Sequence, residues 1–339
     1  MTMRNLYRET FDHVHASQAL RQEVWSMTRR ERNEEKRRRI PAAALIAAIL
    51  VLALTGTTLA AVGVPGTIKG WFVREWAELS GGEMSDEQLS LIDELTQQVG
   101  VSDTSGGVTV TLDSVTSGDS ALWLLLKVDL GVDRQEDYLY NFNGVDLEFT
   151  PDPDQVDTPG GYGWDFPYVG VAEDGKLTLL MRYTIDLIGE ASLLDGCQAD
   201  LHLGDLLWGD SVVQEGEWDL SFTLEPTVQT ILTLEEIEVP AYDDEAKGNT
   251  TVELRDVRIS ATGIRYTQAA EDQMSRPMLE GLVLKVGTEV SYSGGAARWT
   301  DETEKGRWAS DFYWKLPVDL SQVEGVRFGD TVIPLDGME

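Results

Sequence analysis

The side chains best suited to catalysis or metal binding are few in this chain. It has one cysteine, Cys197, and three histidines, His13, His15 and His202. A single cysteine excludes an intrachain disulfide and every zinc site built from several cysteines. A Ser–His–Asp triad in the main body would need His202, which lies in the alternating segment Ala199–Leu203, typical of a half-exposed strand. Since no GxxxxGK[ST] loop and no GxGxxG after a strand occurs, we expect no enzyme activity and no cofactor.

Three closely spaced aspartates form the best candidate for a cation site. Asp152, Asp154 and Asp157 lie in the Pro/Gly-rich segment Pro151–Pro167. Their oxygens suit Ca²⁺, but the glycine and terminal glutamate of an EF-hand loop do not accompany them. We therefore favour a solvated acidic loop, with calcium binding as the alternative, and assign no metal site.

The charge of the chain changes sharply along its length. The 339 residues contain 27 Lys and Arg against 59 Asp and Glu, a formal net charge of −32. Residues 1–39 carry a net charge of +4, residues 40–68 carry none, and residues 69–339 carry −36. So acidic a chain does not bind nucleic acid directly, because that binding needs Lys and Arg against the phosphates. The pattern predicts a basic head, an apolar segment and an acidic body.

The apolar segment has the length of a membrane span. Ile40–Val62 comprises 23 residues, roughly 34 Å as an α-helix, against a hydrocarbon core of about 30 Å. We therefore predict a transmembrane helix over 40–64. A cleaved signal peptide is the main alternative, since Thr58–Ala60 resembles a small-x-small cleavage site, and a buried core helix is the weaker one.

Basic residues next to this segment set its predicted orientation. By the positive-inside rule, they place the N-terminus in the cytoplasm and the acidic body outside the cell. The same side chains would contact membrane lipid headgroups. The cluster consists of Arg29, Arg30, Arg32, Lys36, Arg37, Arg38 and Arg39.

The head, residues 1–39, has the periodicity of two short amphipathic helices. Thirty-odd residues cannot bury an apolar face on their own. One interpretation is a docking surface for a cytoplasmic partner, formed by Tyr7, Phe11, Val24 and Trp25. The alternative is a solvated stalk that only leads into the anchor.

Helical signals continue over residues 65–100, outside the predicted span. Trp71–Trp76 has the pattern of an amphipathic helix, whose tryptophans lie either at the bilayer surface or against the next domain. Ser85–Gln88 has capping-box spacing, and it starts a second helix that we expect to end at Gly100.

Beyond residue 100 the hydrophobic period changes from about 3.6 to 2. Short strands without long helices between them favour β-sandwiches, which we divide into two domains, 101–226 and 227–339. The fold class is therefore mainly β with a membrane anchor. The expected strands are Val108–Leu112, Leu122–Asp129, Val145–Phe149, Leu177–Ile185, Ala199–Leu203, Trp218–Leu224, Thr230–Val239, Thr250–Ile259, Gly281–Val290, Asp311–Pro317 and Val323–Phe328.

Two phrases in the body resemble a known family. VTVTLDSVTSGDSALWLLLKVDL (Val108–Leu130) resembles the opening hairpin of domain of unknown function four-one-seven-nine, found in single-pass envelope proteins of Gram-positive bacteria. TVELRDVRISATGIRY (Thr251–Tyr266) is similar to the start of the immunoglobulin-like domain that often follows it. The head is similar to the cytoplasmic segments of membrane anti-sigma-factor-like proteins. The resemblance implies immunoglobulin-like sandwiches and a transmembrane regulator that holds a cytoplasmic sigma factor, although the zinc motif of many anti-sigma factors is missing.

A second class of function stays open. The outer sandwiches would then form an envelope-binding module for a wall polymer, a peptide or a protein, and the head would only orient insertion. Exposed aromatic residues would suit stacking on such a ligand. The candidate ligand loop contains Tyr162, Trp164 and Phe166.

Overall fold

The computed structural model describes most of the chain from residue 66 onward. Residues 61–339 belong to one compact unit. The described ranges are 66–130, 140–150, 163–171, 176–185, 194–227, 230–269, 272, 274–299 and 307–335. The predicted docking residues of the head, its basic cluster, the apolar segment, the three loop aspartates and Tyr162 lie outside these ranges. Among the described residues, no helix is long and apolar enough to span a bilayer.

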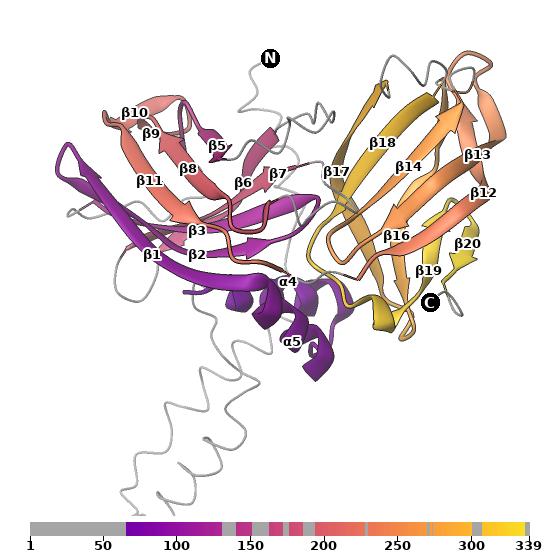
Figure 1. The fold of residues 1–339 in the computed structure, drawn as a ribbon, viewed down its shortest axis with the longest axis horizontal. Coiled ribbons are helices and arrows are strands. Elements are labelled where there is room, and N and C mark those ends of the chain that lie inside the picture. Colours follow the sequence, from indigo (N-terminus) through magenta and orange to yellow (C-terminus); the bar gives the residue numbers. More distant parts are fainter. Residues whose placement is uncertain are drawn as a thin grey trace, which may run out of the picture. The chain divides into compact units, whose positions relative to one another are not determined.

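In the described part of the chain, two α-helices precede the strands (Figure 1). Helix α4 (Ile68–Ser80) begins at Thr67, whose hydroxyl accepts from Gly70 N, and ends at Gly81 with φ +66°. The N-cap bond and the left-handed C-terminal glycine are the usual helix-terminating devices. Helix α5 (Asp86–Leu95) begins at Ser85, whose hydroxyl accepts from Gln88 N at 3.2 Å, as its capping-box spacing predicts.

Helix α5 ends earlier than the sequence pattern suggests. The expectation that it runs to Gly100 is wrong, because strand β1 begins at Thr96. Gly100 has φ +73° and lies at a β-bulge in that strand, where the pairing shifts between Gln98 and Val101. A left-handed glycine serves a bulge as well as a helix end, and the local sequence does not distinguish the two.

The first β block is a β-sandwich of eleven described strands, all paired antiparallel. One sheet has the order β1-β2-β3-β7-β6, and two three-stranded sheets have the orders β11-β8-β5 and β10-β9-β4. The strands are β1 Thr96–Ser105, β2 Val108–Ser117, β3 Ala121–Asp129, β4 Tyr140–Phe142, β5 Asp146–Thr150, β6 Gly163–Val171, β7 Leu177–Thr184, β8 Gln198–Leu203, β9 Leu206–Trp208, β10 Ser211–Gln214 and β11 Trp218–Thr223.

Polar side chains of β1 cover the outer edge of β11. Asp103 Oδ2 accepts from Asp219 N at 2.9 Å, and Ser105 Oγ accepts from Glu217 N at 3.2 Å. Gln97 Nε2 donates to the carbonyl of Thr223 at 2.8 Å. These bonds satisfy backbone groups that an edge strand otherwise leaves open to another chain.

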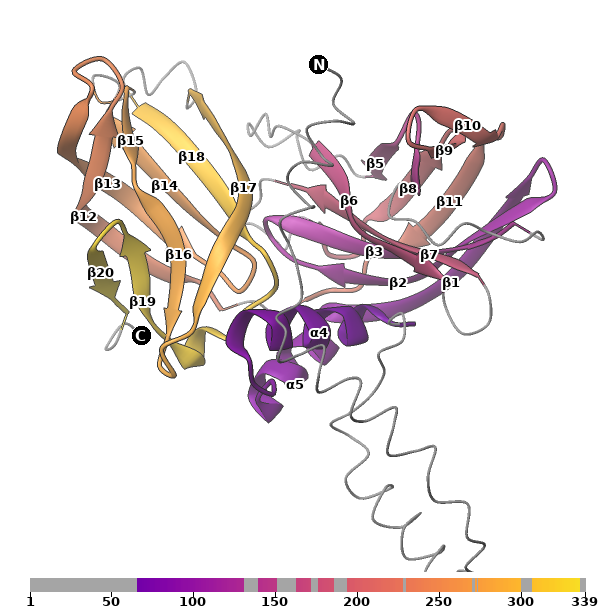
Figure 2. The ribbon, with the colours of Figure 1, turned by 180° about the vertical axis from the view of Figure 1, so that it is seen from behind.

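The described residues of the second β block form one nine-stranded, half-barrel sheet of order β15-β12-β13-β14-β18-β17-β16-β19-β20 (Figure 2). Its pairs are also antiparallel. A 3₁₀ turn, η5 (Leu320–Gln322), precedes β19. The strands are β12 Leu232–Asp243, β13 Gly248–Ile259, β14 Gly263–Ala269, β15 Ser275–Pro277, β16 Leu279–Leu284, β17 Glu289–Trp299, β18 Arg307–Trp314, β19 Val323–Phe328 and β20 Thr331–Pro334.

Two segments have a structure that differs from the expected one. Gly281–Val290 is not one strand, because β16 ends at Leu284 and β17 starts at Glu289. The end of the predicted loop Pro151–Pro167 also differs, since Gly163–Pro167 belongs to strand β6. Pro167 fits there because β6 is the last strand of its sheet, where a missing N–H costs no ladder bond.

The buried apolar residues form two cores. One lies wholly within the first β block and includes Leu124, Leu201 and Trp218. The other contains residues of both helices, of the outer face of the first block and of the second block together, for example Phe72, Trp123 and Trp314. The second core therefore connects three parts of the chain that are distant in sequence.

Candidate functional site: the helix junction

Helix α4 has a buried stripe at helical spacing. Ile68, Trp71, Phe72, Glu75 and Trp76 are all buried, and Trp71 and Trp76 are only 2% and 6% exposed. Of the two positions considered for these tryptophans, packing against the β domains is therefore the observed one. The side of α4 that carries them is covered by protein.

Contacts to the first β block come from the middle of the helix. The Phe72 ring meets Trp71 edge-on at 5.0 Å between centroids and Trp123 of β3 at 5.6 Å. Arg74 Cζ lies 4.3 Å from the centroid of the Tyr168 ring on β6, a cation–π contact.

Contacts to the second β block come from both helices. Glu75 Oε2 of α4 lies 3.0 Å from Lys315 Nζ. In α5, the fully buried Gln88 donates to Pro317 O and accepts from Asp319 N, both at 2.7 Å. A single amide side chain thus satisfies one donor and one acceptor of the segment that follows β18.

A buried polar cluster links the two β blocks directly. Asp119, in the turn between β2 and β3, accepts from Ser260 Oγ at 2.6 Å and from Thr262 Oγ1 at 2.5 Å. Ser120 Oγ donates to Thr262 O at 2.6 Å. A Cβ at Gly118 would lie 2.4 Å from a Thr262 carbon, so this close approach requires glycine.

Arg182 of β7 forms a second direct link. Its Nε and Nη2 donate to Asp165 at 3.0 and 2.6 Å, and its Nη1 donates to Ser293 Oγ of β17 at 2.7 Å. The guanidinium also lies over the ring of Tyr313, 4.7 Å from the centroid. Burial raises the pKa of Tyr313, an effect that the nearby Arg182 charge opposes and Asp165 reinforces.

These contacts define the helix junction: α4, α5, and the residues of both β blocks that touch them. Apolar contacts, the Glu75–Lys315 ion pair and the two hydrogen bonds of Gln88 dominate it. Its arrangement suits mechanical coupling, because any shift between the blocks changes the packing around α4.

A shallow crease on the first β block is the second candidate. The strand pairs β4/β5, β8/β9 and β10/β11 each break at a glycine, and the crease, of about 610 Å³, lies over these breaks. Gly144, Gly204 and Gly216 line it together with the polar residues Ser105, Asn143, His202, Asp205, Glu215 and Glu217. Asp205 already accepts from Gly216 N at 3.0 Å, so part of this polarity serves the strand breaks themselves.

His202 occupies the half-exposed strand position that its alternating segment predicts. Its Nδ1 lies 2.8 Å from Asp219 Oδ1 on β11. In the sheet, the neighbouring position on the other flanking strand, β5, is Asp146. No hydroxyl nucleophile is bonded to the ring among the described residues, so the arrangement does not form a triad.

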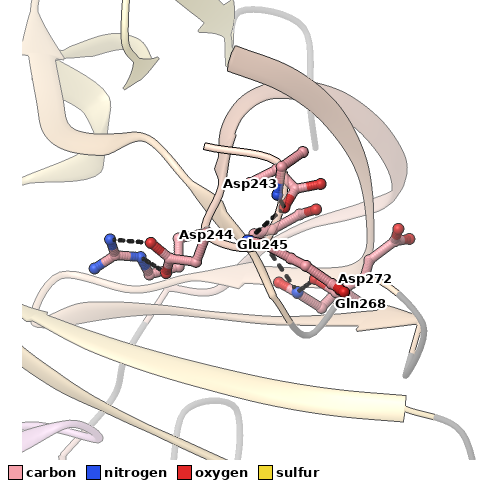
Figure 3. Close-up of polar contacts among 8 residues, drawn as sticks. Asp243, Asp244, Glu245, Gln268 and Asp272 are labelled. Atoms are coloured by element: carbon pink, nitrogen blue, oxygen red, sulfur yellow. Dashed lines mark hydrogen bonds and ion pairs between the residues drawn. The ribbon is translucent and has the colours of Figure 1, made fainter. Parts of the chain in front are cut away.

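Acidic residues also gather at the hairpin between β12 and β13 (Figure 3). Asp243 accepts from the backbone N–H of Glu245 at 2.8 Å, and Asp244 pairs with Arg276 at 2.6 Å. The buried Gln268 donates to Asp272 O at 2.7 Å. Their polar atoms bind the turn and its neighbours, and no group of three or more His, Cys, Asp or Glu among the described residues is arranged to hold a metal.

The remaining predicted residues separate into surface and core. Trp164 on β6 is 42% exposed. Phe166 packs against the core of the first β block, and its ring centroid lies 6.2 Å from that of Phe142. The candidate ligand loop therefore presents one exposed aromatic ring among its described residues. Burial, and secondarily the charge of Asp195, raises the pKa of the Cys197 thiol, consistent with an unreactive cysteine.

Sequence reasoning missed the residues that join the blocks. Asp119 lies in the turn before β3, and Arg182 lies in β7. The local sequence pattern predicts the turn and the strand, but not a contact with the other block. An arginine within the apolar run Leu177–Thr184 was the one available signal, since a buried arginine must be paired.

No family model matches the chain, and no curated protein matches it. A solved structure, described as the crystal structure of the conserved domain protein from Bacillus anthracis, is similar at 15% sequence identity with a TM-score of 0.42, covering 73% of this chain and 86% of that one.

Proposed function

We propose that this chain is a single-pass membrane protein that couples an outer β body to a cytoplasmic segment and regulates a cytoplasmic partner, in the manner of an anti-sigma factor. In this proposal residues 40–64 span the membrane, the basic cluster faces the cytoplasm, and both β blocks lie outside, the first as an immunoglobulin-like sandwich. The uncharged segment and the asymmetry of charge around it support the topology.

One observation supports coupling between the predicted span and the β body. Helix α4 starts at Ile68, six residues after the apolar segment ends at Val62, and its stripe is buried in a core shared with both β blocks. A span attached in this way has no long linker to absorb motion. A rearrangement of the β body would therefore move the end of the span.

The test is capture of cytoplasmic proteins by the full chain in its native membrane. The proposal predicts a sigma factor that co-purifies with the wild type and is lost from the double variant Phe11→Ala/Trp25→Ala. His13→Ala, a polar change in the same head, is the matched control and should retain the partner. Recovery of no specific cytoplasmic protein, or an unchanged yield from the double variant, would contradict the proposal.

The envelope-binding module is the alternative outcome. The exposed ring of Trp164 is the observation that favours it. In that case Trp164→Ala would weaken retention of the protein by purified cell-wall material, and the head variants would have no effect.

A further inference from the structure

Two indole groups beside α4 are buried without a hydrogen-bond acceptor. Trp71 is 2% exposed and Trp123 is fully buried, yet neither Nε1 has a partner among the described residues. Both rings pack against Phe72. The Nε of Arg74, on the same helix, is also buried without a hydrogen bond, although it lies 3.9 Å from Glu78 Oε1 in an ion pair.

Other fully buried tryptophans differ in this respect. Trp218 Nε1 donates to Val108 O and Trp314 Nε1 donates to Ser260 O, each at 3.1 Å. Of the three tryptophans with less than 2% exposure, only Trp123, which contacts α4 through Phe72, lacks an acceptor. Trp208 Nε1 on β9 also lacks an acceptor, so two of the three unpaired indoles among the described residues lie beside α4.

Unpaired buried donors oppose the docking of α4. Each loses its bonds to water when the helix docks and gains none in return, so part of the free energy from burying Ile68 and Phe72 is cancelled. Undocking returns these N–H groups to water. The ladders between β2, β3 and β7 beneath the helix include no residue of α4, so undocking the helix breaks none of their backbone bonds.

We infer that α4 is a switch built into the fold: the helix undocks from the two β blocks as a unit while the sheets stay paired. The inference deepens the proposed function, on which its biological use rests, because undocking would release the span from the β body. Its physical content, local opening of one helix, needs neither a membrane partner nor a ligand.

Native-state hydrogen exchange on the full-length chain in lipid nanodiscs tests this. Amides of Trp71–Trp76 should exchange at least about tenfold faster than those of Leu122–Val128 in β3, as expected for local opening rather than global unfolding. Equal exchange rates for the two segments would overturn the inference.

Paired tryptophan variants test the cause. Trp123→Phe removes an unpaired donor, so exchange in Trp71–Trp76 should slow severalfold relative to wild type. Trp314→Phe removes a paired donor from the same core and should not slow it. Trp71→Phe provides a second variant of the first kind. If Trp123→Phe and Trp71→Phe leave exchange in α4 unchanged or accelerate it, the unpaired donors are not what weakens docking, and the inference fails.

The two proposals fail separately. If α4 exchanges only as fast as the sheets and a sigma factor is still captured, the switch is overturned and the regulatory function is not. Local exchange in α4 without any captured partner leaves the switch and contradicts the regulatory function.

Discussion

The hydroxyl of Ser260 lies 2.6 Å from Oδ1 of Asp119, although the two residues are 141 positions apart and belong to different β blocks. Both are fully buried. A buried carboxylate requires such donors, because an ionised group removed from water is otherwise strongly destabilised. The pair shows that the two β blocks are fastened to each other as well as to the helices.

Removal of this carboxylate should weaken the whole body. We expect Asp119→Ala to lower the free energy of unfolding by about 3 kcal/mol, since hydrogen bonds to charged groups contribute about 1.5–3 kcal/mol each. Asp119→Asn keeps an acceptor oxygen and should cost less than half as much. Urea unfolding measures both, and a change below about 0.5 kcal/mol for Asp119→Ala would show that the contact stabilises nothing.

The strand breaks at the crease should depend on glycine. A Cβ at Gly204 would lie 2.5 Å from the carbonyl oxygen of Asn143, so Gly204→Ala should destabilise the first block by about 1–3 kcal/mol. Gly248, at the start of β13, has no heavy atom within 4 Å of such a Cβ and is the control. Thermal melts should separate the two variants, and equal melting temperatures would refute the steric argument.

Trp164 and Phe166 should respond differently to truncation. Phe166 is half-buried against the first core, so Phe166→Ala should cost about 2 kcal/mol, somewhat less than the 3–5 kcal/mol typical of a fully buried phenylalanine. Trp164→Ala removes an exposed ring and should cost less than about 1 kcal/mol. If denaturant titrations show a larger loss of unfolding free energy for Trp164→Ala than for Phe166→Ala, the assignment of Phe166 rather than Trp164 to the core is contradicted.

Alkaline pH should unfold the protein partly through Tyr266. Burial raises the pKa of this phenol far above its ordinary value of 10.0, so the unfolded state loses the proton first. Its contribution to stability is complete below pH 10.0 and is lost as the pH rises above it. Tyr266→Phe should therefore flatten the decline in stability above pH 10, measured by circular dichroism. An unchanged alkaline slope would contradict this role.

Local patterns predicted the mainly β fold and many of its strands. Val323–Phe328 forms β19 with the expected bounds, because alternation and turn residues mark both ends. Strand β6 was missed because Pro167 and its glycines resemble a loop, and only its place at a sheet edge makes a strand tolerable there.

The junction was less predictable than the strands. The sequence indicated that α4 is amphipathic, but not which surface covers its stripe, since Tyr168 and Lys315 lie far along the chain. Long-range pairs such as Gln88 with Pro317 leave no periodic pattern, and a polar side chain in a helix usually lies in solvent.

Topology is the most direct test of the account. Cys197 is buried, so the wild-type chain serves as an unlabelled blank, and single cysteines can be added at Val286, which is 77% exposed in the turn after β16, and at Asn5 in the head. Intact cells are treated with a membrane-impermeant maleimide. The account predicts that Val286→Cys reacts in intact cells and that Asn5→Cys reacts only after permeabilisation. Protection of Val286→Cys until the cells are opened, or recovery of the chain in the soluble fraction, would contradict a membrane-anchored protein with its β body outside.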